Sequence, residues 1–140
     1  MPKEPTKKTL KRQTDEVFSK YVLHSRADSN GQLTCITCER RLPIAECDCG
    51  HFIGRRIESL RYDERNVAPQ CRYCNRFGKY GRGEQYLFGR ALERVERGRS
   101  EQLMREARTG GQLSRTDLRK LRDKYRRLYA EHRERNDLDD

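Results

Sequence analysis

The fold of this 140-residue chain is decided by residues 35–75, which read CITCERRLPIAECDCGHFIGRRIESLRYDERNVAPQCRYCN. A Cys-x-x-Cys pair opens this stretch at Cys35 and Cys38, and a second pair closes it at Cys71 and Cys74. Two such pairs supply the four thiolates that tetrahedral zinc prefers, and each two-residue spacer lets both sulfurs reach one ion. The sequence therefore predicts a structural zinc site that closes a long loop. Unliganded or redox-active cysteines are the alternative.

The composition explains why such a crosslink is needed. Only 33% of the residues are hydrophobic, 39% are charged, and there is no tryptophan, so a large apolar core cannot be assembled. The length suits one compact domain. Lys and Arg number 32 against 22 Asp and Glu, which gives a net charge of +10. We therefore expect a polyanionic partner, with a merely soluble basic surface as the alternative.

The compartment is inferred from what the sequence lacks. Residues 1–12 contain no apolar run of the secretory type, and no stretch approaches the roughly 20 apolar residues of a membrane span. A cytoplasmic protein is expected, and there paired cysteines are more often metal ligands than disulfides. Cys47 and Cys49 are expected to be plain buried thiols. Exchange of one of them with a cysteine of the two pairs is the alternative.

Helical periodicity is confined to the flanks of the cysteine region. Two prolines and five Lys or Arg residues in residues 1–13 predict a disordered basic arm. Apolar residues at helical spacing predict a helix from Thr14, short strands and turns between Leu33 and Asn75, and further helices over 75–79, 83–97 and 100–108. The expected division is an arm (1–13), a zinc-bound domain with flanking helices (14–109), and a C-terminal helix with an acidic tail (110–140).

The C-terminal segment predicts one long helix. Ser114 and Asp117 form a short version of the capping box, and apolar residues follow at alternating steps of three and four to about Arg135. The resulting apolar stripe is narrow. We expect it to pack on its own domain, with a homodimer seam through this helix as the alternative.

The stretch between the cysteine pairs gathers polar residues of a kind that phosphodiester hydrolysis requires. His51, the nearby carboxylates, Asn66 and Asn75 are all enclosed or flanked by the expected zinc site. Hydrolysis with a single hard cation needs a base to deprotonate water, oxygen ligands for the cation, and positive charge around the phosphate. An ordinary histidine pKa near 6.5 leaves His51 mostly neutral at cytoplasmic pH, as a general base must be. A zinc-ligating or structural His51 is the alternative.

These residues resemble the phage NinG/Rap recombination nucleases, which act on branched DNA. The resemblance covers roughly residues 15 to 130 and rests on motifs that occur in the same order. They are Phe18-Ser19, Cys35-Ile-Thr-Cys38, Asp48-x-Gly50-His51, Glu64-Arg65-Asn66-Val67, Gln70-Cys71-x-x-Cys74-Asn75 and Tyr86. The cysteine frame is also similar to phage endonuclease VII, a zinc-bound Holliday-junction resolvase with an HNH-like site. The resemblance implies a small α+β fold with a zinc-stapled ββα-metal (HNH) core, flanking helices and a long C-terminal helix.

The same resemblance implies roles for individual residues. His51 resembles the general base, Asn75 an oxygen ligand of a catalytic Mg²⁺ or Mn²⁺ ion, and Asn66 the asparagine that pins the loop and orients the base. Many HNH sites place the metal-binding aspartate directly before the histidine, where this chain has Gly50. Because strand side chains alternate, Asp48 lies on the same face as position 50, and we expect it to reach the ion.

A dense basic set surrounds the expected site and predicts contacts with DNA phosphates. Its members are Arg55, Arg56, Arg61, Arg65, Arg72, Arg76 and Lys79. Arginines near a phosphate position it and offset the charge that develops in the transition state. The function expected from the sequence is a metal-dependent, structure-specific endonuclease of branched DNA in phage recombination. The alternative is a zinc-stapled nucleic-acid binding module without catalysis.

Overall fold

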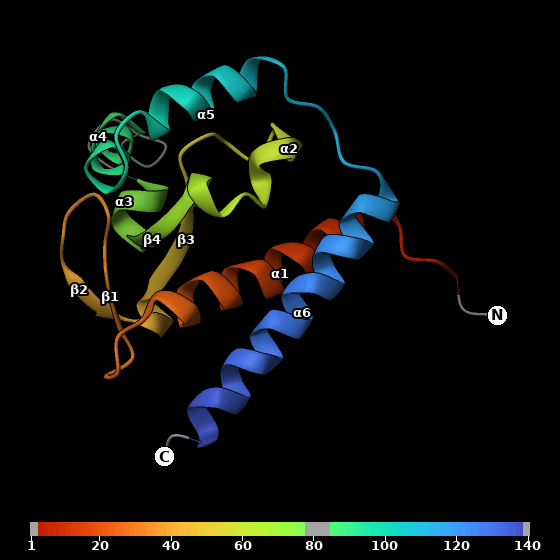
Figure 1. Cartoon of the computed structure of the whole chain (residues 1–140), viewed down its shortest axis with the longest axis horizontal. Helices are drawn as coiled ribbons and strands as arrows, with labels where there is room; N and C mark the ends of the chain where they lie inside the picture. The colour runs from red at the N-terminus through yellow and green to blue at the C-terminus, as the bar shows by residue number, and fades with distance from the viewer. Residues whose placement is uncertain (1–2, 78–84, 139–140) are drawn as a thin grey trace.

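The structure, a computed structural model, describes residues 3–77 and 85–138 (Figure 1). Two pairs of strands lie beside two crossing long helices, and two shorter helices cover the opposite edge (Figure 1). In chain order the elements are α1 Lys7–Arg26, β1 Gln32–Thr34, β2 Arg41–Pro43, η1 Ile44–Glu46, β3 Cys47–His51, α2 Glu58–Arg61, η2 Glu64–Asn66, β4 Val67–Cys71, α3 Arg72–Arg76, α4 Gln85–Val95, α5 Arg99–Arg108 and α6 Arg115–Leu138. The expected small α+β fold with a long C-terminal helix is confirmed.

Helix α1 begins well before the expected start at Thr14. Thr6 is the N-cap, and its hydroxyl accepts a hydrogen bond from the backbone N–H of Thr9 at 3.1 Å. The expectation of a disordered arm over 1–13 is therefore wrong for residues 7–13. The reason is tertiary packing, since Leu10 is only 1% exposed and the Thr14 hydroxyl reaches the Leu118 carbonyl at 3.4 Å. A buried apolar face stabilises a helix that composition alone did not favour.

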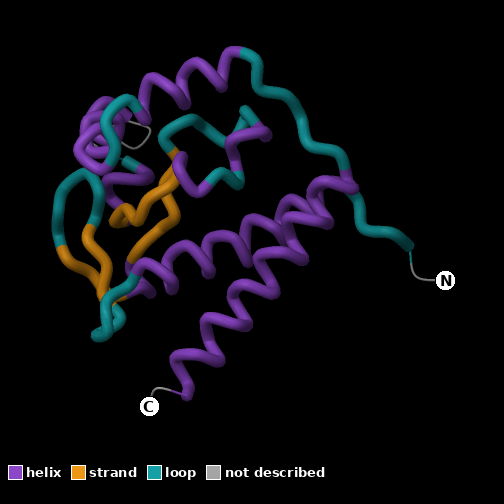
Figure 2. The backbone as a smooth tube through the Cα atoms, in the orientation of Figure 1, coloured by secondary structure: helices purple, strands orange, loops and turns teal. Residues whose placement is uncertain are grey.

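Helix α6 starts at the predicted capping box. The Ser114 backbone N–H donates to Asp117 Oδ2 at 2.9 Å, and the Asp117 N–H donates to Ser114 Oγ at 3.0 Å. Leu118 and Tyr125 are buried on the face that α6 turns toward α1. The two helices run side by side over much of their length (Figure 2). The apolar stripe thus packs within its own chain, as expected.

Strand β3, strand β4 and helix α3 form one packed unit, although α2 and η2 lie between the two strands in the chain. The strands are antiparallel, pairing Cys47 with Cys71 and His51 with Val67, and α3 follows β4 without a linker. Strands β1 and β2 form a second antiparallel pair that carries the first cysteine pair in its connection. The short strands expected between residues 33 and 75 are confirmed, whereas α2, η1 and η2 are too short for periodicity to reveal them.

The remaining predicted helices are present with shifted ends. The helix expected over 75–79 begins earlier, at Arg72, and ends at Arg76, so Lys79 lies outside the described residues. The helix expected over 83–97 spans Gln85–Val95 in the described part of the chain, and the one over 100–108 spans Arg99–Arg108.

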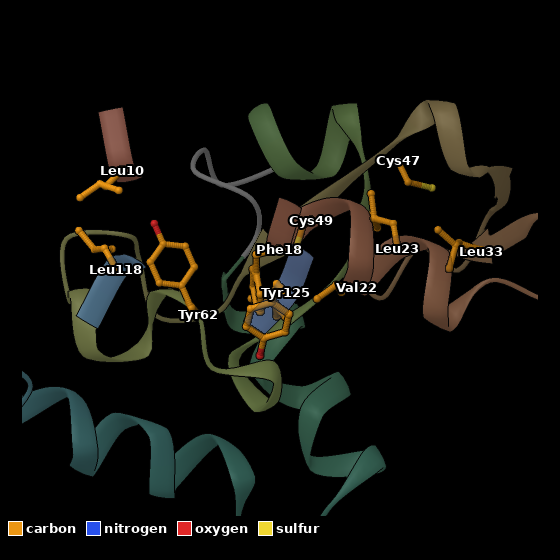
Figure 3. Close-up of a cluster of buried hydrophobic side chains, with 11 residues drawn as sticks. Leu10, Phe18, Val22, Leu23, Leu33, Cys47, Cys49, Tyr62, Leu118 and Tyr125 are labelled. Carbon is orange, nitrogen blue, oxygen red and sulfur yellow. The ribbon is translucent and has the colours of Figure 1, made fainter. Parts of the chain in front are cut away.

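The apolar core is divided into small clusters. The largest lies between α1, α6 and the strands, where the Phe18 ring meets Tyr125 and Tyr62 edge-on at centroid distances of 4.8 and 5.6 Å (Figure 3). A second cluster surrounds Phe52 and Phe88 beneath α4 and α5. Three of the four paired cysteines form a third cluster of buried residues. This division agrees with the low apolar content of the sequence.

Candidate functional site

The four predicted zinc ligands come together in space. The sulfur atoms of Cys35, Cys38, Cys71 and Cys74 all lie within 4.8 Å of one another. The Cys38 and Cys71 sulfurs are 3.9 Å apart, close to the edge of about 3.8 Å of a tetrahedron with 2.3 Å Zn–S bonds. Because soft thiolates in this arrangement match the donor set that zinc prefers, the residues fit a structural Zn²⁺ ion.

Backbone donors support the first sulfur of each pair. The Cys38 N–H lies 3.5 Å from Cys35 Sγ, and the Cys74 N–H lies 3.4 Å from Cys71 Sγ. Burial opposes ionisation of Cys35, but N–H and hydroxyl donors outweigh it and lower the pKa of this thiol. Burial and the neighbouring thiols raise the pKa of Cys38 and Cys74. A cation between the four sulfurs reverses that penalty, because it stabilises every thiolate.

Cys47 and Cys49 lie outside this cluster. Both side chains are buried in the core between α1 and the strands, with exposed fractions of 7% and 5%. Burial raises the pKa of Cys49 to about 12, so it is a neutral thiol at neutral pH. Their expected role as plain buried thiols agrees with this placement.

A separate cavity of about 520 Å³ opens beside β3. Its lining comes from α1, β3, α3 and the turn after β3. Asp48, His51 and Asn75, which the sequence singled out individually, all line it, together with Arg55 and Arg76. The fold therefore brings these five side chains to one concave surface.

The His51 ring is held in a defined orientation. Its Nε2 atom lies 2.9 Å from the backbone carbonyl oxygen of Arg61. A carbonyl oxygen only accepts hydrogen bonds, so Nε2 must carry the proton and Nδ1 keeps a free lone pair. Desolvation by burial, reinforced by the cations of Arg55 and Arg61, lowers the pKa of His51 to about 4. The imidazole is therefore neutral over the whole physiological range.

Asp48 and Asn75 meet across the β3–α3 corner. Asn75 Nδ2 donates to Asp48 Oδ2 at 3.0 Å. The Arg76 guanidinium also binds this carboxylate, through Nε at 3.1 Å and Nη2 at 3.3 Å. Asp48 thus lines the cavity of His51, and its oxygens are shared with an arginine of the same site.

Asn66 is the most deeply buried polar residue of the site region, with an exposed fraction of 0%. Its Oδ1 accepts from the Ile53 N–H at 2.7 Å, and its Nδ2 donates to the carbonyls of Ile53 and Leu60, each at 3.0 Å. The side chain thereby fixes both ends of the segment from residue 53 to residue 60. This is the loop that follows His51 and leads to Arg61.

A family comparison covers almost the whole chain. The model of the bacteriophage lambda NinG protein matches residues 3–135. The chain belongs to the NinG family. No curated protein and no solved structure is significantly similar to this NinG-family chain. None of the helices in the described ranges is long and apolar enough to cross a membrane.

The basic residues of this NinG-family chain divide by their partners. Arg61 is paired with Asp15 and Arg65 with Asp63 and Glu106. Arg72 donates to the Ala45 carbonyl and Arg76 to Asp48. Among the described residues, Arg55 and Arg56 are exposed and carry no acidic partner. Lys79 lies outside the described residues.

Sequence reasoning missed a second basic surface and the acidic residue beside it. A cavity of about 670 Å³ lies along α1 and is lined by Lys7, Lys8, Lys11, Arg12, Asp15, Glu16, Ser19 and Arg61. Ser19 also lines the cavity of His51, so the two cavities adjoin at this residue. The cluster of lysines was visible in the sequence, but the disorder expected there concealed its place beside the site.

Proposed function

We propose that this NinG-family chain is a metal-dependent endonuclease of the HNH (ββα-metal) type that hydrolyses phosphodiester bonds in branched DNA. The observation that carries the proposal is that His51, with Nδ1 free, shares one cavity with Asp48 and Asn75. The unit that presents them pairs β3 with β4, with α2 and η2 between these strands in the chain, and continues from β4 into α3, an arrangement compatible with that fold class. The phage family supports a role in phage recombination.

In this proposal His51 is the general base. A water molecule in the cavity gives its proton to Nδ1, while the Arg61 carbonyl holds the ring through Nε2. A low pKa weakens the base but keeps it in its acting form, so no proton has to be removed before the reaction begins. Arg55, which lines the same cavity, is placed to bind a phosphate oxygen and offset charge in the transition state.

Asp48 and Asn75 are the proposed oxygen ligands of a Mg²⁺ or Mn²⁺ ion, which supplies Lewis-acid stabilisation of the scissile phosphate when bound. One carboxylate and one amide suit Mg²⁺, which usually keeps several waters and few protein ligands. Two adjustments of the side chains would be needed to hold the ion. Asn75 donates Nδ2 to Asp48, so its carboxamide would turn over to present the oxygen, and Arg76 would release the carboxylate.

The Asp48–Arg76 ion pair also supports the competing function. A carboxylate that is already satisfied by an arginine needs no cation, as expected of a zinc-bound nucleic-acid binding module without catalysis. Both functions share DNA as the partner and the +10 charge as its attraction. A homodimer through the C-terminal helix stays a prediction.

The test is cleavage of a four-way DNA junction and a supercoiled plasmid with Mg²⁺, with Mn²⁺, and with EDTA. We expect metal-dependent cleavage by the wild type, and a loss of about 10²-fold to 10⁴-fold in His51→Ala with junction binding retained. His132→Ala is the matched control, because its ring hydrogen-bonds with Asn136 on α6 and lines neither the cavity of His51 nor the basic cavity along α1. If the wild type binds the junction without cleaving it, the nuclease proposal is wrong and the function is that of a nucleic-acid binding module.

A further inference from the structure

A single carboxylate on α1 anchors two consecutive residues at the end of α2. Asp15 accepts from Arg61 Nε at 2.9 Å and Arg61 Nη2 at 2.5 Å. The hydroxyl of Tyr62 donates to the same carboxylate at 2.8 Å. The side chains of Asp15 and Arg61 are 25% and 14% exposed. These contacts are therefore well shielded from solvent, unlike a surface ion pair.

The two anchored residues flank one peptide group. The carbonyl of that peptide belongs to Arg61 and accepts the hydrogen bond from His51 Nε2 at 2.9 Å. A peptide group is planar, so fixing the chain on both sides of it fixes the direction in which the carbonyl points. Asp15 thus controls the acceptor that selects the His51 tautomer, although its side chain has no hydrogen bond to His51.

The short α2 helix explains why such an anchor is needed. It spans only Glu58–Arg61, and the carbonyl of its last residue has no partner within the helix. One turn of helix has little stability by itself. Asn66 fixes the start of the segment through Ile53 and the Leu60 carbonyl. Asp15 supplies the matching constraint at the end of the helix, at residues 61 and 62.

We propose that Asp15 is a positioning residue for His51, acting through the peptide group between Arg61 and Tyr62. This inference rests on the proposed function for the role of His51 as a base, but the geometry it describes exists without substrate. Arg61 consequently serves the site through its backbone and its ion pair rather than as a free phosphate ligand. Helix α1 thereby becomes part of the site that β3 and α3 carry.

Nuclear magnetic resonance of the His51 ring nitrogens tests the geometry independently of activity. A neutral imidazole held in one tautomer gives two well-separated ¹⁵N signals, and exchange between tautomers draws them together. We expect well-separated signals in the wild type and converging signals in Asp15→Asn. Glu16→Gln is the matched control, because it removes the same charge one residue away, where the exposed carboxylate forms an ion pair with Lys20 instead of with Arg61. It should leave the His51 signals unchanged.

Kinetics on a DNA junction test the consequence for the reaction. For Asp15→Asn we expect kcat to fall roughly 10-fold to 100-fold, in the range of losses on removing a residue that orients a metal ligand, with KM for DNA unchanged. In a His51→Ala background the same substitution should cost nothing further, because the group that it positions is gone.

A second variant keeps the proposal testable if Asp15→Asn fails to fold. Tyr62→Phe removes one anchor and leaves the Arg61 fork and the aromatic packing in place. It should cause a smaller convergence of the same two signals. Unchanged His51 signals in the folded variant overturn the proposal even if the protein is an active nuclease. An inactive wild type with converging signals in the variant overturns the proposed function alone.

Discussion

The carboxamide of Gln70 fills the space that a β-carbon on Gly50 would need. An ideal Cβ at position 50 would lie 2.7 Å from Gln70 Cδ and 2.9 Å from Gln70 Cγ, both too close for real atoms. Gln70 is 1% exposed, so its side chain cannot simply swing into solvent. A carboxylate directly before His51 is therefore excluded by packing. Asp48, two residues upstream, is the carboxylate of β3 that reaches the cavity.

The first prediction follows from this contact. Gly50→Ala should destabilise the protein by about 1–3 kcal/mol, the usual cost of adding atoms to a closely packed interior. Urea unfolding followed by circular dichroism measures it. Gly54→Ala is the control, because a β-carbon there meets nothing within 4 Å. In a Gln70→Ala background the cost of Gly50→Ala should shrink, and an unchanged cost would show that the strain arises elsewhere.

Zinc removal should unfold the region around the cysteine cluster. Structural zinc contributes on the order of 10 kcal/mol or more of apparent binding free energy in small modules. We expect one zinc per chain by elemental analysis and loss of ellipticity with a strong chelator. Cys71→Ser should lower the zinc content, whereas Cys49→Ser, which changes a buried thiol outside the cluster, should retain it. A folded, chelator-resistant protein without zinc would contradict the assignment.

Asn75→Ala and His51→Ala should respond differently to metal concentration. Losing an oxygen ligand weakens cation binding, so cleavage by Asn75→Ala should recover partly at high Mg²⁺ or Mn²⁺. Losing the base cannot be compensated by more cation. Initial cleavage rates over a metal titration distinguish the two variants. Equal recovery of both would assign His51 to metal binding instead of proton transfer.

The stability of the protein should fall as the pH drops from about 6.5 to 4. Burial lowers the pKa of His51 to about 4 in the folded protein, while the unfolded chain keeps the ordinary value near 6.5. The unfolded state therefore binds more protons in this window, and the contribution of His51 is present above pH 6.5 and lost toward pH 4. His51→Gln, which retains a donor for the Arg61 carbonyl, should reduce the slope of the free energy of unfolding over this window. Equal slopes in the wild type and His51→Gln would contradict the lowered pKa of His51.

DNA affinity should depend on the basic surface of α1. Lys8 and Arg12 are exposed and have no acidic partner among the described residues, unlike Lys7 and Lys11, which pair with Glu58. Removing two phosphate contacts should reduce the slope of log affinity against log salt by about 1 to 2. The test protein is the double variant Lys8→Ala/Arg12→Ala, and its salt slope is compared with that of a control double variant.

The control pair is Arg127→Ala with Arg135→Ala, which removes the same charge from the exposed side of α6. It should change the salt slope little, since these residues lie away from both cavities. Fluorescence anisotropy on a junction at several salt concentrations gives both slopes. Equal reductions of the salt slope in the two double variants would indicate that DNA responds to the overall charge of the protein and not to a specific basic surface on α1.

Local chemistry was predictable from the sequence. The two Cys-x-x-Cys spacings gave the four ligands, because each pair reaches one point regardless of the rest of the fold. The Ser114–Asp117 capping box was predictable for the same reason, since both of its hydrogen bonds span three residues. The predicted helix start at Thr14 was wrong, because the helix is extended by the burial of Leu10, which depends on α6 at the other end of the chain.

Long-range partners could not be predicted. Arg61 and Arg55 are the same residue type in the same basic stretch, yet one is fixed by Asp15 and the other lines the cavity without an acidic partner among the described residues. The pairing of Arg61 spans 46 positions. No local pattern distinguishes Asp15 from its acidic neighbour Glu16. The cavity around His51 could not be predicted either. It forms where α1, β3 and α3 pack together, and the order of these elements in the sequence does not show which of their surfaces meet.

The packing of α6 on α1 sets the order in which the molecule can mature during synthesis. Thr14 and Leu118 lie 104 positions apart, yet they meet in the same buried layer. A ribosome therefore releases the zinc cluster and the β3–β4 strand pair long before α6 emerges to cover the apolar face of α1. Until then that face is open to solvent and to chaperones. A nascent chain can therefore bring its four clustered cysteines together early, but α1, which carries Asp15, is covered only after α6 has left the exit tunnel.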